Sequence, residues 1–174
     1  RPVSRLAPDQ YAGHQHSLRA FVRDVADRFD RVLVDNPPDL GFCAWAALTA
    51  ADCVLTPVQA NAKGFKGLHA VNQFVAQVQA SANARLVQLG NVRTVFEARK
   101  NVHMIYSARI ERQHPGLLLQ AAFPKAAQFE DADAARAPIT HYKPRCAASR
   151  AVQCITDEIE ARLRPAAEAY REVA

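Results

Sequence analysis

The feature that most constrains the fold is a regular alternation between apolar runs and stretches of helical periodicity. Apolar runs lie at residues 31–35, 53–58, 86–96 and 117–123. Between them, apolar side chains recur at three- and four-residue spacing, as in residues 63–80, which is typical of amphipathic helices. Nearly continuous apolar strands separated by helices are typical of a parallel sheet that is covered on both faces. The sequence therefore predicts an α/β fold, with a mostly parallel sheet flanked by helices on both faces.

Length and composition indicate an ordinary globular domain. We expect residues 1–174 to form a single α/β domain, with residues 1–16 as an irregular lead-in. No apolar run approaches the roughly 20 residues that a membrane-spanning helix needs, so we expect no membrane insertion. The four cysteines show no CxxC spacing, which favours reduced thiols in a cytoplasmic protein over a metal site. The formal net charge of +5 is compatible with DNA binding that does not depend on sequence.

An acidic residue ends the first apolar run. We expect a buried strand over 31–35 that ends at Asp35, followed by a loop that contains Pro37 and Pro38. In open α/β sheets, ligands bind just outside the carboxyl ends of the strands. An Asp in this position holds magnesium in nucleotide hydrolases. The alternative is a turn-capping Asp, since Asp beside Pro is common in turns.

Five ordered blocks along the chain resemble the ParA-type partition ATPases, which belong to the deviant Walker A group of P-loop proteins. The resemblance runs from about Leu18 to the last helix. It is carried by RFDRVLVDNPPDLG, AALTAADCVLTPVQ, KGFKGLHAVNQFV, RTVFEARKN and FPKAAQFEDADAARAPITHYKP. It implies a P-loop NTPase-like sheet, with ATP and Mg²⁺ as cofactors.

The resemblance also implies roles for individual residues. Asp35 would be the Walker B carboxylate, acting on magnesium through a water. Pro37 and Pro38 would belong to the switch loop that follows it. Thr94 would lie near the adenine, and the loop of Phe123, Pro124 and Lys125 would pack on the other side of the purine.

Further implications concern partners and location. Members of the family form ATP-dependent homodimers that bind DNA non-specifically, and a centromere-binding partner of ParB type stimulates their hydrolysis. This implies a cytoplasmic, nucleoid-associated protein. The residues that we expect to contact DNA are Arg99, Lys100, Arg145 and Arg150, although each taken alone fits a solvated helix face better, because Arg and Lys on helices are usually solvated. Arg162 and Arg164 are spaced to pair with Glu158 and Glu160 along one helix.

One family element has no counterpart here. No GxxxxGK[ST] string, the phosphate-binding loop of this group, occurs in the 174 residues. Gly64-Phe65-Lys66-Gly67 is no substitute, because it opens a helix after a different strand. We therefore expect a C-terminal portion of a ParA-like domain, incomplete at its N-terminus, that hydrolyses no ATP by itself. Two alternatives remain: a truncated, non-catalytic interaction module, and a MinD-like or cellulose-synthesis accessory ATPase.

Overall fold

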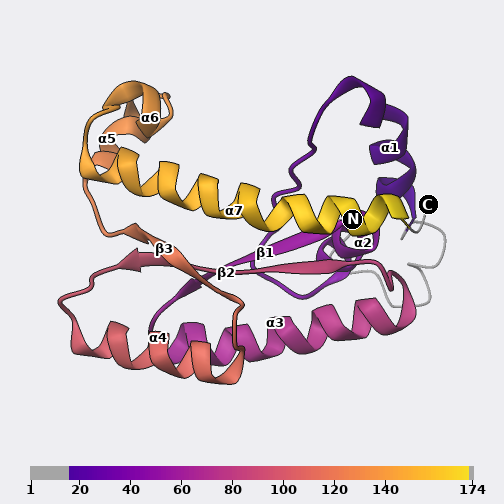
Figure 1. Cartoon of the computed structure of the whole chain (residues 1–174), viewed down its shortest axis with the longest axis horizontal. Helices are drawn as coiled ribbons and strands as arrows, with labels where there is room; N and C mark the ends of the chain where they lie inside the picture. The colour runs from indigo at the N-terminus through magenta and orange to yellow at the C-terminus, as the bar shows by residue number, and fades with distance from the viewer. Residues whose placement is uncertain (1–15, 173–174) are drawn as a thin grey trace, which may run out of the picture. The chain divides into compact units, whose positions relative to one another are not determined.

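The computed structural model describes residues 16–172, and their side chains as far as Pro165. The predicted lead-in over 1–16 therefore lies almost wholly outside the described residues. The elements, labelled in Figure 1, are α1 (Ser17–Val25), the 3₁₀ turn η3 (Ala26–Arg28), α2 (Phe42–Ala50), β1 (Cys53–Gln59), α3 (Ala62–Ser81), β2 (Val87–Phe96), α4 (Asn101–Gln113), β3 (Leu118–Pro124), α5 (Gln128–Ala134), α6 (Ile139–Tyr142) and α7 (Ala147–Glu172).

The three strands form one parallel sheet in the order β1-β2-β3. In the pairing of β2 with β3, Asn91 lies opposite Leu118 and Phe96 opposite Pro124, with irregularities in between. Gly90, in β2, has a positive φ of 146°. A Cβ at this position would collide with the Leu117 carbonyl oxygen, so the two strands approach here as only glycine allows. The parallel α/β class is confirmed.

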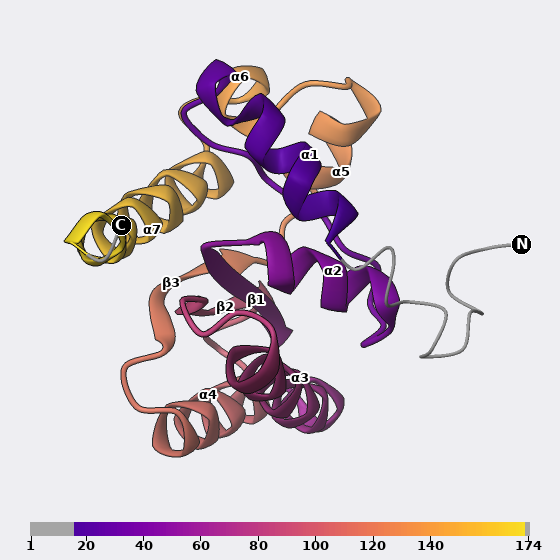
Figure 2. The ribbon, with the colours of Figure 1, turned by 90° about the vertical axis from the view of Figure 1, so that its right-hand side faces the viewer.

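The described chain divides into two compact units. One unit contains residues 55–69 and 88–172. This unit has two separate hydrophobic clusters, and two adjacent residues of β3 each belong to one of them. Leu118 packs with Val58, Leu68 and Ile110 of β1, α3 and α4. Leu119 packs with Val92 of β2 and with Ile155 of α7. Because neighbouring strand residues point to opposite faces, α4 and α7 cover opposite sides of this part of the sheet, as Figure 2 shows.

The other unit contains the described residues up to Val54 together with Ala70–Val87. Its core joins α2 to the second half of α3. Val75 and Val78 are buried there, and the rings of Trp45 and Phe74 meet nearly at right angles, with centroids 5.8 Å apart. Asn83 donates hydrogen bonds from Nδ2 to the carbonyl oxygens of Leu48 (2.9 Å) and Ala51 (2.7 Å). These bonds satisfy carbonyl groups at the end of α2, which have no partner within the helix.

The predicted strand over 31–35 is wrong: residues 31–37 have no regular secondary structure. Leu33 is 94% exposed, and Val32 and Val34 are about 40% exposed. A strand is stable only when a neighbouring strand accepts and donates its backbone hydrogen bonds, and no described strand pairs with this segment. The apolar composition alone therefore does not produce a strand here.

Helix α1 begins at Ser17, and its N-cap position, His16, makes no side-chain capping bond. Helix α7 continues through Pro165 to Glu172. Within residues 16–172, no helix is long and apolar enough to cross a membrane.

Candidate nucleotide site

Two of the predicted nucleotide segments lie side by side at the carboxyl edge of β2 and β3. Phe96 is in register with Pro124, and the Lys125 amide donates a hydrogen bond of 3.1 Å to the Phe96 carbonyl oxygen. Thr94 is half-buried near the end of β2, whereas Lys125 is exposed. This edge of a parallel sheet is where α/β proteins bind ligands. The structure thus brings Thr94 and the Phe123–Lys125 loop to one place.

The backbone between Thr94 and Phe96 is strained. Val95 has a φ of 51°, in the left-handed region that a β-branched residue rarely adopts. Such a conformation costs on the order of 1–3 kcal/mol and is often found at ligand sites. It falls within the irregular pairing between Arg93 and Phe96. The end of β2 therefore leaves the ordinary strand geometry at the predicted adenine segment.

Arg93 is a site residue that the sequence reasoning missed. Its guanidinium lies over the Phe96 ring, 4.6 Å from the centroid, and its Nη2 donates to the carbonyl oxygens of Leu119 (2.9 Å) and Gln120 (2.6 Å). Burial lowers the pKa of Arg93, against the opposing attraction of Glu158 and Glu111. A charged residue inside an apolar run was the sequence signal. Arg93 thus links the second half of β2 to the first half of β3.

Phe123 packs inward rather than toward a ligand. Its side chain lies against the core of Val92, Leu119 and Ile155. Its ring also meets the Phe129 ring of α5 edge-on, with centroids 6.3 Å apart. Pro124 and Lys125 are left to form the accessible part of this loop.

Asp35 lies in the extended segment that precedes α2. Its side chain is exposed and has no hydrogen bond or ion pair with any part of the chain that the structure describes. The following loop is a turn in which Asp39 accepts a hydrogen bond of 2.6 Å from the Gly41 amide through Oδ1, and the Asp39 amide donates to the Pro37 carbonyl oxygen (2.8 Å). Asp39 is therefore the turn-forming acid, while the Asp35 carboxylate is available to an external ligand.

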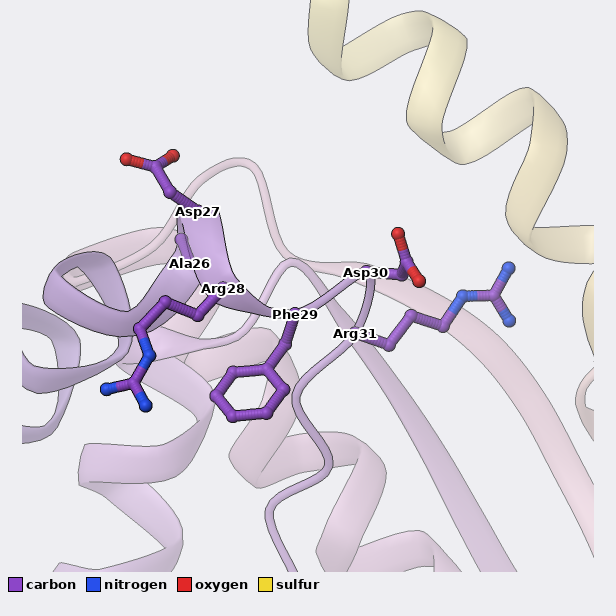
Figure 3. A pocket seen from close by; sticks show the side chains of 6 residues that line it. All are labelled: Ala26, Asp27, Arg28, Phe29, Asp30 and Arg31. Carbon is purple, nitrogen blue, oxygen red and sulfur yellow. The ribbon is translucent and has the colours of Figure 1, made fainter.

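A hollow of about 600 Å³ lies just before Asp35, lined by residues 26–31 (Figure 3). Arg28 sits beside Phe29 within it, with its guanidinium carbon 5.8 Å from the ring centroid. All six lining residues are exposed and consecutive, and none belongs to the predicted nucleotide site. We assign this hollow no ligand.

The four residues predicted to contact DNA lie in two places: Arg99 and Lys100 directly before α4, and Arg145 and Arg150 at the start of α7. Lys100 Nζ lies 2.6 Å from Oε1 of Glu97, and this hydrogen bond is the main cause of the lowered pKa of Glu97. Arg99 is exposed. Arg150 donates from Nη1 to the Arg145 carbonyl oxygen at 2.5 Å. Arg145 and Arg150 are both exposed at the start of α7, whose first turn carries no acidic residue.

Magnesium would need more than this chain's own side chains. In the described range, no cluster of three or more His, Cys, Asp or Glu residues could hold a metal ion. A single exposed carboxylate fits a magnesium ion that keeps most of its waters and is held mainly by bound phosphates. Asp35 fits that limited role.

The architecture and the edge site define a class: this is an α/β protein with a P-loop NTPase-like fold. Its fold matches apo McdA from Cyanothece with a TM-score of 0.74 at 17% identity, covering 83% of this chain and 59% of that one. It also matches cobyrinic acid a,c-diamide synthase from Mycobacterium smegmatis, solved with an ATP analog and magnesium. That match has a TM-score of 0.60 at 26% identity, covering 67% and 46% of the two chains.

Sequence comparison finds similar proteins. Residues 6–88 match a family described as an AAA domain. The chromosome-partitioning ATPase Soj of Treponema pallidum is 27% identical over 83% of this chain and 57% of its own length. Protein IncC of Escherichia coli is 31% identical over 80% of this chain and 39% of its own length. These matches support a ParA-type partition ATPase family, and the chain spans about half the length of these relatives.

Proposed function

We propose that this chain is part of an ATPase that binds ATP with Mg²⁺ and acts in DNA partition. The observation that carries the proposal is the pairing of the Thr94–Phe96 segment with the Phe123–Lys125 loop at the carboxyl edge of the sheet. The strained backbone at Val95 supports it, because strain that the surrounding structure maintains is concentrated at functional sites.

Each predicted residue then has a defined task. Asp35 holds a magnesium-bound water, and the magnesium, when bound, neutralises charge on the phosphates. Pro37 and Pro38 each fix φ near −65°, which leaves the loop after Asp35 few conformations between which to switch. Thr94 supplies a half-buried hydroxyl near the base. Lys125 places a positive charge at the same edge of the sheet.

We extend the proposal to non-specific DNA binding through Arg145 and Arg150. Both lie at the amino end of α7, where the helix dipole is positive, and no nearby first-turn acid offsets their charge. A phosphate would be attracted by both the side chains and the helix end. Homodimer formation and stimulation by a ParB-type partner complete the proposal, supported by the family relationship.

ATP turnover of the full gene product tests the role of Asp35. We expect Asp35→Ala to lower turnover at least about tenfold, because the magnesium loses its protein anchor. Asp30→Ala is the matched control, since it removes an equally exposed carboxylate from the same segment. Undiminished turnover in Asp35→Ala would contradict the magnesium assignment, as would an equal loss in both variants.

Salt-dependent binding to duplex DNA tests the role of the two arginines. We expect Arg145→Glu with Arg150→Glu to weaken binding and to reduce the slope of log affinity against log salt by about 2. Arg19→Glu with Arg23→Glu changes the net charge equally on α1, where Arg19 is half-buried and Arg23 exposed, and serves as the control. Equal losses in both pairs would indicate only bulk charge and would contradict the assigned surface.

A further inference from the structure

The outward side of α4 combines apolar and cationic side chains. Val102, Ile105, Arg109 and Arg112 recur at the three- and four-residue spacing of one helix side. Val102 is 47% and Ile105 55% exposed, and both arginines are exposed as well. On the inward side of the helix, Ser107 and Ile110 are buried. These four outward residues are called the α4 face below.

The cationic end of the α4 face borders a hollow of about 530 Å³, lined by Phe65, Arg109, Arg112 and Gln113. It lies where the first half of α3 runs beside α4 (Figures 1 and 2). The rings of Phe65 and Tyr106 meet there with centroids 5.9 Å apart, and the Arg109 guanidinium lies over the Tyr106 ring at 5.4 Å. An arginine held on an aromatic ring loses less side-chain entropy when it binds a carboxylate.

Charge around this hollow is of one sign. Lys66 and His69 are exposed on α3, and His69 Nδ1 lies 3.5 Å from Nε2 of Gln113. No acidic side chain lines the hollow. The nearby Glu111 instead accepts a hydrogen bond of 3.0 Å from the Gly116 amide. A partner whose charge complements this surface is therefore acidic.

Composition indicates the class of partner. Protein interfaces are enriched in Tyr, Met and Arg and depleted of Lys, and their energetic centres are often Tyr or Arg. Helix α4 contains Tyr106 and three exposed large apolar residues, of which Met104 is 50% exposed, but no lysine. A surface for the DNA backbone needs cations and gains little from exposed Val and Ile. The α4 face thus fits a protein better than a nucleic acid.

We propose that the α4 face docks an acidic amphipathic helix of a partner protein. Apolar side chains of that helix cover Val102 and Ile105, and its carboxylates pair with Arg109 and Arg112. The eleven residues from Val102 to Arg112 span about 15 Å, which matches a partner segment of about three helical turns. This surface uses none of the residues assigned above to nucleotide or DNA, so it goes beyond the proposed function.

The test uses the full gene product, without nucleotide, and a fluorescent peptide of about 18 residues with Leu on one helical face and Glu flanking it. We expect saturable binding in the micromolar range that weakens at least about tenfold in Arg109→Glu with Arg112→Glu. Ile105→Ser should also weaken binding of the peptide, measured at the same ionic strength. Arg19→Glu with Arg23→Glu is the charge-matched control and should bind as the unmodified protein does. The α4 variants change exposed side chains, whereas the control pair changes half-buried Arg19 and exposed Arg23. The thermal midpoint of each variant reports whether it is folded.

Three outcomes would overturn the proposal. The first is no saturable binding by the unmodified protein. The second is equal weakening in the charge-matched control or equal binding of a peptide with Lys in place of Glu, because bulk charge or apolar contact would then suffice. The third is a short DNA duplex that displaces the peptide and loses affinity in the Arg109/Arg112 variant, which would assign the face to DNA. ATP turnover is measured separately, so failure here is distinguishable from failure of the nucleotide site.

Discussion

At the scale of single residues, Gly64 and Gly67 show how two glycines in one helix differ in purpose. Gly64 stands in the first turn of α3, and a Cβ there would collide with the Gln59 carbonyl oxygen and approach its carbonyl carbon. These are backbone atoms, which cannot turn aside as a side chain does. At Gly67, a Cβ would meet nothing within 4 Å. Only Gly64 is required by the close approach of β1 to α3.

We therefore expect opposite effects of alanine at the two positions. Gly64→Ala should lower the free energy of unfolding by more than about 2 kcal/mol, because backbone must shift. Gly67→Ala should raise it by about 0.5–1 kcal/mol, because alanine favours an exposed helix interior. Urea denaturation followed by circular dichroism measures both, and similar effects of the two changes would contradict the geometry.

At the scale of elements, α7 completes the hydrogen bonding of the edge strand β3. The Glu158 carboxylate accepts hydrogen bonds from the amides of Gln120 and Ala121, both at 2.9 Å. Arg162 donates to the carbonyl oxygens of Leu118 (3.2 Å) and, across the strands, Leu89 (2.8 Å). The two side chains also pair with each other at 3.0 Å, as their spacing in the sequence predicted. Helix side chains thus satisfy backbone groups of β3 in the stretch where its pairing with β2 is irregular.

Glu158 gives the stability of this contact a pH dependence. Burial opposes ionisation of Glu158, but the hydrogen bonds from Ala121, Gln120 and Arg162 outweigh it, so the pKa of its carboxyl lies below the usual value. Because the folded pKa is depressed, the stabilisation is present above the unfolded pKa of about 4.3 and is lost as pH falls through the folded value.

Glu158→Gln tests this contact. We expect it to lower the free energy of unfolding at neutral pH by about 1–3 kcal/mol, because an amide replaces a charged acceptor of two amides and a guanidinium. It should also reduce the loss of stability on acidification. Asp157→Asn, at an exposed position on the same helix, should change little. Denaturation midpoints measured over a pH series would contradict the assignment if both variants behaved alike.

At the scale of the whole molecule, the most exposed large apolar side chain within the described residues, Leu33, lies in the segment that was expected to be a strand, and Phe29 lies just before that segment. Leu33 is 94% and Phe29 57% exposed, on backbone that belongs to no strand. Unpaired extended backbone with apolar side chains favours pairing with another chain. Self-association of the isolated chain is the expected consequence.

Leu33→Lys should reduce this self-association while leaving the thermal midpoint nearly unchanged, because an exposed side chain contributes little to the core. Size-exclusion chromatography with light scattering over a concentration series measures it. Phe21→Ser is the control: Phe21 is 59% exposed, but it lies in α1, where the backbone is already hydrogen-bonded. An equal reduction in both variants would mean that apolar exposure alone, and not strand pairing, drives association.

The sequence by itself determined most of the elements and the α/β class. Helical periodicity over 63–80 and apolar runs at 53–58, 86–96 and 117–123 are local signals, and the structure has α3, β1, β2 and β3 at these places. The same kind of signal failed at residues 31–35, because a strand needs a hydrogen-bonded neighbour and an apolar run does not specify one. The blocks that resemble the ParA-type family also identified that family correctly. The nucleotide, magnesium and DNA roles stay predictions.

Only the tertiary structure decided how individual side chains are used. It directs the Phe123 side chain into the core, and it links the second half of β2 to the first half of β3 through Arg93. It also makes Glu158 and Arg162 hydrogen-bonding partners of the β3 backbone. The hydrogen bonds from these three charged side chains to the strands join residues that lie 26 to 73 positions apart in the chain. Periodicity and spacing describe a segment's own faces, whereas a contact of this range depends on where the fold places a second segment.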